Sequence, residues 1–162
     1  MTSLKLLLTA AAFALVLPAC EKDCAKPTPV DTMVFGWFHG YCLGESCIDI
    51  FRIDKAAGQL HEDIKDGYPS PDAAYNGDYQ LAKTLGQYQV VAGLPGQVPA
   101  QLLSHSNGYI GQPDFTDGGG YYVEIQDNGQ RRFWLIDTQK ANIPSYLHPF
   151  VDELEAKIRS LQ

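Results

Sequence analysis

The residues with the most chemical scope in this 162-residue sequence are its four cysteines, two of which lie close together. Cys42 and Cys47 are separated by four residues that include a glycine, and a β-rich segment follows them. Outside the cytoplasm a cysteine pair normally oxidises. A disulfide that closes so short a loop stabilises a fold by about 2 kcal/mol in the chain-entropy model. We therefore expect a structural disulfide between Cys42 and Cys47.

His39 precedes the cysteine pair and permits a second interpretation. One imidazole and two thiolates can bind Cu(I) or Zn(II), and a cysteine pair can exchange electrons with other thiols. Metal-binding loops favour tighter spacings, however, and neither the redox motif Cys-x-x-Cys nor the haem motif Cys-x-x-Cys-His occurs. The sequence thus predicts no cofactor, and a thiol-redox or metal-handling protein that uses His39, Cys42 and Cys47 is the alternative.

The N-terminal segment predicts export and lipid attachment. Lys5 precedes a run of twelve apolar residues, Leu6 to Leu17. This run is shorter than the roughly twenty residues that a membrane-spanning helix needs, and it fits the apolar region of a secretory signal peptide. The run ends in Leu17-Pro-Ala-Cys20, which resembles the lipobox of bacterial lipoproteins. The resemblance implies that residues 1–19 are cleaved off and that Cys20 carries a diacylglycerol and an acyl chain such as palmitate.

The residues after Cys20 predict where the anchored chain resides. In lipoproteins of double-membraned bacteria, Asp after the cysteine favours the inner membrane, so Glu21 favours the outer membrane. Residues 20–32 contain two prolines among charged residues and are predicted to form a tether, in which Cys24 also lies. Residues 33–162 are then a single domain of ordinary size, attached to the cell envelope by lipid.

The charge balance limits the classes of partner that the domain can bind. The whole chain has 12 basic and 19 acidic residues, and removal of the signal peptide takes away Lys5 alone among them. Such an acidic domain, without a cluster of Lys and Arg, is not suited to electrostatic binding of nucleic acid or anionic lipid. We therefore expect membrane contact through the lipid anchor and no nucleic-acid partner.

A Gly-rich segment carries the other unusual chemistry. Asp114 and Asp117 precede Gly118-Gly-Gly120, and their carboxylates could contribute to a weak Ca²⁺ site. Aspartates in turns more often bond to nearby backbone, however. The nucleophile motif Gly-x-Ser-x-Gly and the metalloprotease motif His-Glu-x-x-His are both missing. We therefore predict no catalytic residues.

Two elements follow directly from residue patterns. Residues 121–126 and 130–136 are rich in strand-forming types and flank Asn128-Gly129, which predicts a β-hairpin with Val123 opposite Trp134. Apolar residues recur at helical spacing toward the C-terminus and predict a helix with one buried stripe. Ser145 can cap this helix with Pro149 in its first turn, or the helix starts at Pro149. The stripe contains Leu147, Phe150, Val151, Leu154, Ile158 and Leu161.

The remaining elements complete the predicted architecture. Residues 32–38, 47–53 and 59–64 are rich in strand-forming types. Asp78 could cap a helix that ends at Gly86, and Pro99 could open another that contains Leu102 and Leu103. The chain is therefore predicted to be an α+β domain, with a mainly antiparallel sheet packed by the C-terminal helix and one or two shorter helices.

Three segments resemble a group of small bacterial lipoproteins. They are residues 39–53 with the two cysteines, residues 110–124 with the Pro-Asp-x-x-Asp-Gly-Gly pattern, and residues 134–137 before the Pro-rich entry to the last helix. These proteins are domains of unknown function with a Gly/Cys-rich first hairpin. The resemblance spans roughly residues 33–160. It implies one domain in a secreted lipoprotein context and transfers no catalytic residues.

The aromatic content suggests what such a domain does. Five of the nine tyrosines could form a binding surface, although aromatics at such spacings are more often part of a core or its rim. They are Tyr68, Tyr75, Tyr79, Tyr88 and Tyr109. The sequence therefore predicts an envelope lipoprotein that acts as a non-catalytic binding or scaffolding domain, with a protein or a glycan as its partner.

Overall fold

The computed structural model describes residues 31–40, 42, 46–127 and 129–162. Its centre is a seven-stranded sheet in the order β4-β3-β2-β1-β6-β7-β5, in which only β5 and β7 pair in parallel. The strands are β1 Thr32–Phe38, β2 Ile48–Asp54, β3 Gln59–Glu62, β4 Leu81–Ala82, β5 Gly108–Ile110, β6 Gly120–Asp127 and β7 Gln130–Asp137. The predicted signal peptide, Cys20 and Cys24 lie outside the described residues.

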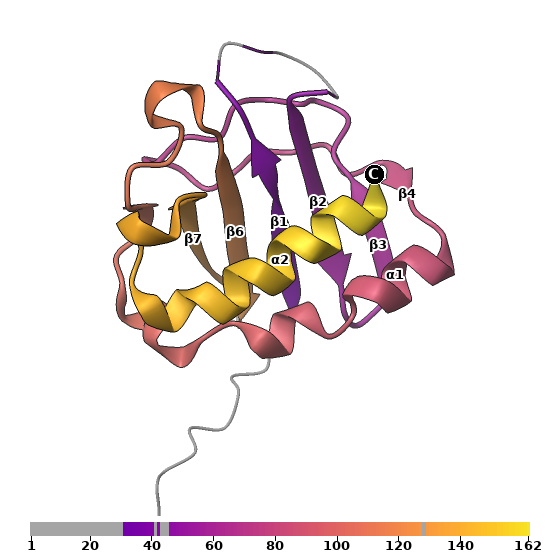
Figure 1. Ribbon diagram of the computed structural model, residues 1–162. Coiled ribbons are helices and arrows are strands. Elements are labelled where there is room, and N and C mark those ends of the chain that lie inside the picture. Colours follow the sequence, from indigo (N-terminus) through magenta and orange to yellow (C-terminus); the bar gives the residue numbers. More distant parts are fainter. Residues whose placement is uncertain (1–30, 41, 43–45, 128) are drawn as a thin grey trace, which may run out of the picture.

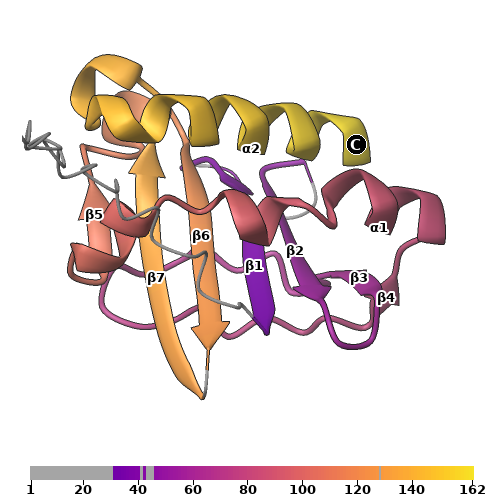
Figure 2. The same ribbon diagram turned by 90° about the horizontal axis from the view of Figure 1, so that it is seen from below.

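Two α-helices, α1 (Leu85–Val91) and α2 (His148–Leu161), cover the same face of the sheet (Figure 2). The C-terminal helix α2 crosses β7, β6, β1 and β2 diagonally, while α1 lies beside β3 and β4 (Figure 1). Short 3₁₀ turns make up the other helical segments, at Leu94–Gln97, Ala100–Ser104, Phe115–Asp117, Lys140–Asn142 and Ser145–Leu147. The predicted α+β class is confirmed. None of the helices in the described part of the chain has the length and apolar character to cross a membrane.

The predicted β6–β7 hairpin is present with its predicted register. Val123 lies opposite Trp134, and Tyr121 lies opposite Ile136. Gly129 has a φ of 78°, a left-handed conformation that glycine adopts without steric cost. The other residue of the predicted turn, Asn128, is outside the described residues.

The core between the sheet and the helices is built from the predicted stripe of α2. All six of its residues are buried, and Leu147 and Leu154 are completely inaccessible to solvent. They pack on Val123, Trp134 and other side chains of the central strands. Of the two predicted starts, the cap at Ser145 is wrong, because Ser145 opens a 3₁₀ turn. The helix α2 instead begins beside Pro149 and has no side-chain cap.

The opposite face of the sheet holds a second core with a polar network. Residues 63–80 contribute Tyr75, which packs on Tyr122, and its backbone N–H donates to the Tyr122 hydroxyl at 2.8 Å. That hydroxyl donates to Glu124 at 2.6 Å, and the Arg131 guanidinium donates to both carboxylate oxygens of Glu124. Glu124 is therefore buried with its charge paired, which is the condition under which burial of a carboxylate is tolerated.

The helix predicted after Asp78 is wrong. The backbone N–H of Asp78 donates to the buried carboxylate of Asp63, and its carbonyl accepts the N–H of Ile64. These bonds hold Asp78 in an irregular segment. The helix begins later, where Thr84 and Gln87 form a capping box. The segment after Pro99 is a 3₁₀ turn, and the third strand ends two residues earlier than predicted.

Replacement of Leu154 by Asp should unfold the domain. The change removes a completely buried side chain from the centre of the α2 stripe and places a charge there. We expect a loss of several kcal/mol, a large part of a total stability of roughly 5–15 kcal/mol. Ala156→Asp puts the same charge on the exposed side of α2 and is the matched control. Thermal melts that are equal for the two variants would contradict the docking of α2.

Candidate functional site

A row of three side chains crosses the helix-covered face near one end of the sheet. Trp37 on β1 lies directly opposite Tyr121 on β6 and directly opposite Asp49 on β2. All three face the helices, because side chains alternate along a strand and the row is in phase with the buried Phe35 and Phe51. We call Tyr121, Trp37 and Asp49 the Trp37 row.

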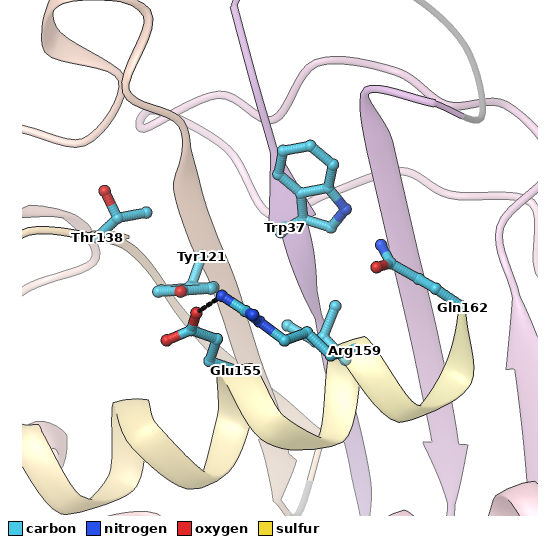
Figure 3. Close-up of a pocket in the computed structure, with 7 residues that line it drawn as sticks. Trp37, Tyr121, Thr138, Glu155, Arg159 and Gln162 are labelled. Atoms are coloured by element: carbon cyan, nitrogen blue, oxygen red, sulfur yellow. Dashed lines mark hydrogen bonds and ion pairs between the residues drawn. The ribbon is translucent and has the colours of Figure 1, made fainter.

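Two cavities lie along the Trp37 row, beside the last turns of α2. One has a volume of about 260 Å³ and is lined by Trp37, Tyr121, Thr138, Glu155, Ile158, Arg159 and Gln162 (Figure 3). The other, of about 330 Å³, is lined by Trp37, Ser46, Asp49, Glu62, Lys83, Leu161 and Gln162. Because both cavities include Trp37 and Gln162, we treat them together as the Trp37 groove.

Two polar atoms on residues that line this groove are closed to solvent and have no hydrogen-bond partner among the described residues. They are the indole Nε1 of Trp37, a donor, and the Oδ1 of Asp49, an acceptor. Asp49 is only 9% exposed, and its other oxygen accepts a hydrogen bond from the Gln162 amide at 3.0 Å. Most buried polar side-chain atoms are paired, so an unpaired donor and an unpaired acceptor on directly opposed residues require an explanation.

An ion pair lines the groove together with Asp49. Glu62, which is 5% exposed, pairs with Lys83. Burial raises the pKa of the Asp49 carboxyl, the hydrogen bond from Gln162 lowers it, and the negative charge of Glu62 raises it again. The net direction is upward, so Asp49 holds its proton at a higher pH than an exposed aspartate does.

The other end of the groove has a second ion pair. Arg159 and Glu155 lie one helical turn apart on α2 and pair with each other, as the sequence spacing indicates (Figure 3). Tyr121 lies beside them. Burial raises the pKa of Tyr121 to about 12, and the neighbouring Glu155 carboxylate adds to the rise. The phenol therefore stays neutral at neutral pH.

The predicted cysteine site lies next to the groove. Cys42 and Cys47 form a disulfide with their Cα atoms 5.5 Å apart, and the adjacent Ser46 lines the groove. His39 donates its Nδ1 hydrogen to the Gly40 carbonyl at 2.8 Å and places its ring edge-on to Trp37. In the described ranges, no three His, Cys, Asp or Glu side chains are grouped closely enough to share a metal ion.

Asp114 organises the Gly-rich segment through its own hydrogen bonds. Its carboxylate accepts the backbone N–H groups of Gly40 and Gly119 at 3.0 and 2.9 Å, and the Tyr68 hydroxyl at 2.7 Å. Burial alone would raise the pKa of Asp114, but these hydrogen bonds lower it overall. Asp117 is exposed and has a φ of 57°. The geometry matches the backbone-bonding role that the sequence favours for these turn aspartates over a Ca²⁺ site.

The five tyrosines of the predicted binding surface do not form one surface. Tyr75 is buried in the second core, Tyr79 packs against that core, and Tyr88 packs on the helix side. Tyr68 and Tyr109 are exposed and line a separate cavity of about 490 Å³ with Asp114 and Phe115. The Trp37 groove contains two other aromatic residues, of which Trp37 was not singled out by the sequence and Tyr121 was named only as part of the hairpin.

Sequence reasoning also missed Asp49, Glu62, Lys83 and Gln162. One local indication existed: Asp49 is acidic at a position in phase with Phe51 and Ile53, where an apolar residue is expected. Nothing local connects it with Trp37 or Gln162, because these residues meet only through strand pairing and the docking of α2.

The chain was also compared with known proteins. No significant match was found among family models, curated proteins or solved structures. The function of the chain must therefore be inferred from the geometry of the Trp37 groove.

Proposed function

We propose that this chain is a lipid-anchored, non-catalytic binding domain of the bacterial cell envelope, and that the Trp37 groove is its ligand site. The observation that carries the proposal is the unpaired Trp37 Nε1 and Asp49 Oδ1 on opposed residues. A ligand that bonds to both atoms would recover the hydrogen bonds that folding leaves unmade there.

The energetic reason is the cost of burying a polar atom without a partner. Each such atom costs about 1–3 kcal/mol. The same protein pairs Glu124 fully on the opposite face of the sheet, so its fold can satisfy a buried carboxylate. His61, Tyr79 and Trp134 also hold unpaired atoms within the described residues, but none of the three lines the groove.

The side chains that line the groove are suited to ligand recognition. They are an aromatic ring, a carboxyl, an amide and two ion pairs, gathered in cavities of about 260 and 330 Å³. Small-molecule sites have volumes of about 300 Å³ and upward, with an apolar lining and a few convergent polar groups. This composition favours binding of a small polar ligand or of one end of a larger one.

The position of the groove suits an anchored protein. The chain enters the sheet at Thr32, the first residue of β1, and Trp37 lies five residues farther along that strand. At about 3.3 Å per residue, this places the groove roughly 17 Å from the entry point. A tether that ends at Thr32 would hold the groove at the end of the sheet remote from the membrane.

Replacement of Cys20 by Ala should abolish lipid attachment, because the thiol is the predicted acceptor of the diacylglycerol. Metabolic labelling with a tagged fatty acid should be lost, and the domain should appear in the soluble envelope fraction. Cys24→Ala is the matched control and should label as the wild type does. A Cys20→Ala protein that still sediments with membranes would show the anchor assignment to be wrong.

Ligand binding at the groove can be tested with three separate probes. They are protease-treated peptidoglycan, vesicles of envelope lipid, and a peptide digest of envelope proteins. At least one should slow hydrogen exchange in the mature chain at residues 36–38 and 158–162, which border the groove. Trp37→Ala should remove the protection, and Tyr109→Ala, an exposed aromatic on the other face, should keep it. Absence of protection by all three probes would contradict the proposal.

The thiol alternative uses the Cys42–Cys47 disulfide beside the groove. If the disulfide is structural, the double Cys→Ser variant should fold with a loss of about 2 kcal/mol and keep its binding. Thiol titration of the unreduced protein should then find both cysteines oxidised. Stoichiometric Cu or Zn that is lost on His39→Ala would instead support the metal-handling function.

A further inference from the structure

We propose that the Trp37 groove binds a neutral saccharide, with one hydroxyl or acetamido group held between Trp37 Nε1 and Asp49 Oδ1. This inference rests on the proposed binding function of the groove and specifies its ligand class. It follows from the unpaired donor and acceptor, from the charged side chains around them and from the aromatic side chains of the Trp37 row.

The two unpaired atoms select a group that both donates and accepts. An indole nitrogen is a donor only, and the Asp49 oxygen accepts. An ammonium group would bond to Asp49 but leave the Trp37 N–H unpaired. A carboxylate or phosphate would bond to Trp37 but face the carboxyl of Asp49. A hydroxyl or a secondary amide satisfies both atoms at once.

The surrounding charges also favour a neutral ligand. Glu62 pairs with Lys83, and Glu155 pairs with Arg159, so the ionic groups at both ends of the groove already have partners. Burial raises the pKa of Asp49, which opposes its ionisation. The charged side chains of these two ion pairs therefore need no counter-ion from the ligand.

The Trp37 row supplies an aromatic platform of the kind that sugar rings use. Trp37 is partly exposed and lies beside Tyr121 on the neighbouring strand. The axial C–H groups of a pyranose ring carry partial positive charge and pack on the electron-rich face of an aromatic ring. Gln162 and the two ion pairs surround this platform and can bond to the remaining hydroxyls.

A peptide fits this position less well than a saccharide. Extended peptides gain much of their affinity from main-chain hydrogen bonds at an exposed sheet edge. The Trp37 row lies on the face of β6, β1 and β2, which are interior strands of the sheet. Their backbone groups are used in strand pairing along this row, so a ligand there must bind through side chains.

Titration of the mature chain with chitotriose, a neutral trimer of N-acetylglucosamine, tests the assignment. Calorimetry should show saturable binding, and tryptophan emission should change. That change should come from Trp37, because Trp134, the other tryptophan, is completely buried. Cellotriose, which lacks the acetamido group, then distinguishes hydroxyl recognition from acetamido recognition.

Three variants separate the contacts. Trp37→Phe keeps an aromatic ring but removes the N–H, and Asp49→Leu removes the acceptor at similar size. Each should weaken chitotriose binding about tenfold, the effect of losing about 1.4 kcal/mol. Asp49→Asn keeps a carbonyl oxygen and should stay within about threefold of the wild type, since only a hydrogen bond to a neutral group is involved. Tyr109→Ala should bind as the wild type does, and melting temperatures check that each variant is folded.

Other outcomes overturn the assignment. Retention of full chitotriose binding by both Trp37→Phe and Asp49→Leu would show that neither atom contacts the sugar. Protection of the groove by the lipid or peptide probe, with no binding of either trisaccharide, would reject the saccharide and leave the binding function standing. Cleavage of chitotriose, detected by mass spectrometry, would reject the non-catalytic function.

Discussion

The docking of α2 on the sheet determines the rest of this structure. The helix has 14 residues, so it is about 21 Å long at 1.5 Å per residue. Seven strands at about 4.8 Å spacing span roughly 29 Å, and one helix cannot cover such a face. The apolar stripe of α2 covers the middle strands, while α1 and the 3₁₀ turns cover part of the remainder. The Trp37 groove lies on these middle strands, β6, β1 and β2, at the end of the strands that α2 leaves uncovered beside its last turns.

Buried polar groups on the two faces of the sheet differ in how completely they are hydrogen-bonded. On the face opposite the helices, Tyr122, Glu124 and Arg131 satisfy one another, so that the network packs like an extension of the core. On the helix side, Gln162, the residue after α2, donates a hydrogen bond to only one oxygen of Asp49. The first arrangement stabilises the fold, because its charge and hydrogen bonds are paired. The second leaves hydrogen-bonding capacity unused among the described residues, which is the property expected of a binding site.

Two features of the groove connect it to its proposed setting. It lies at the far end of β1 from the point where the chain enters the sheet, so a tether would present it away from the membrane. Its charged side chains are already in ion pairs, so recognition depends on hydrogen bonds and stacking. Interactions of that kind are less sensitive to salt than those between unpaired charges, which suits a protein outside the cytoplasm.

Local patterns in the sequence determined the elements that need no distant partner. The hairpin of β6 and β7 and the buried stripe of α2 follow from strand-forming residues, a turn pair and helical spacing, all within some twenty residues, and both are present as predicted. The helix predicted after Asp78 failed because its N–H bonds to Asp63, a tertiary contact that a local pattern does not contain. The groove likewise depends on tertiary contacts that no local pattern contains. Trp37, Asp49, Tyr121 and Gln162 come together only through strand register and helix docking. Sequence alone thus determined the elements and their buried faces, because periodicity is local. Only the tertiary structure decided which polar side chains meet at the uncovered end, because that depends on where α2 stops.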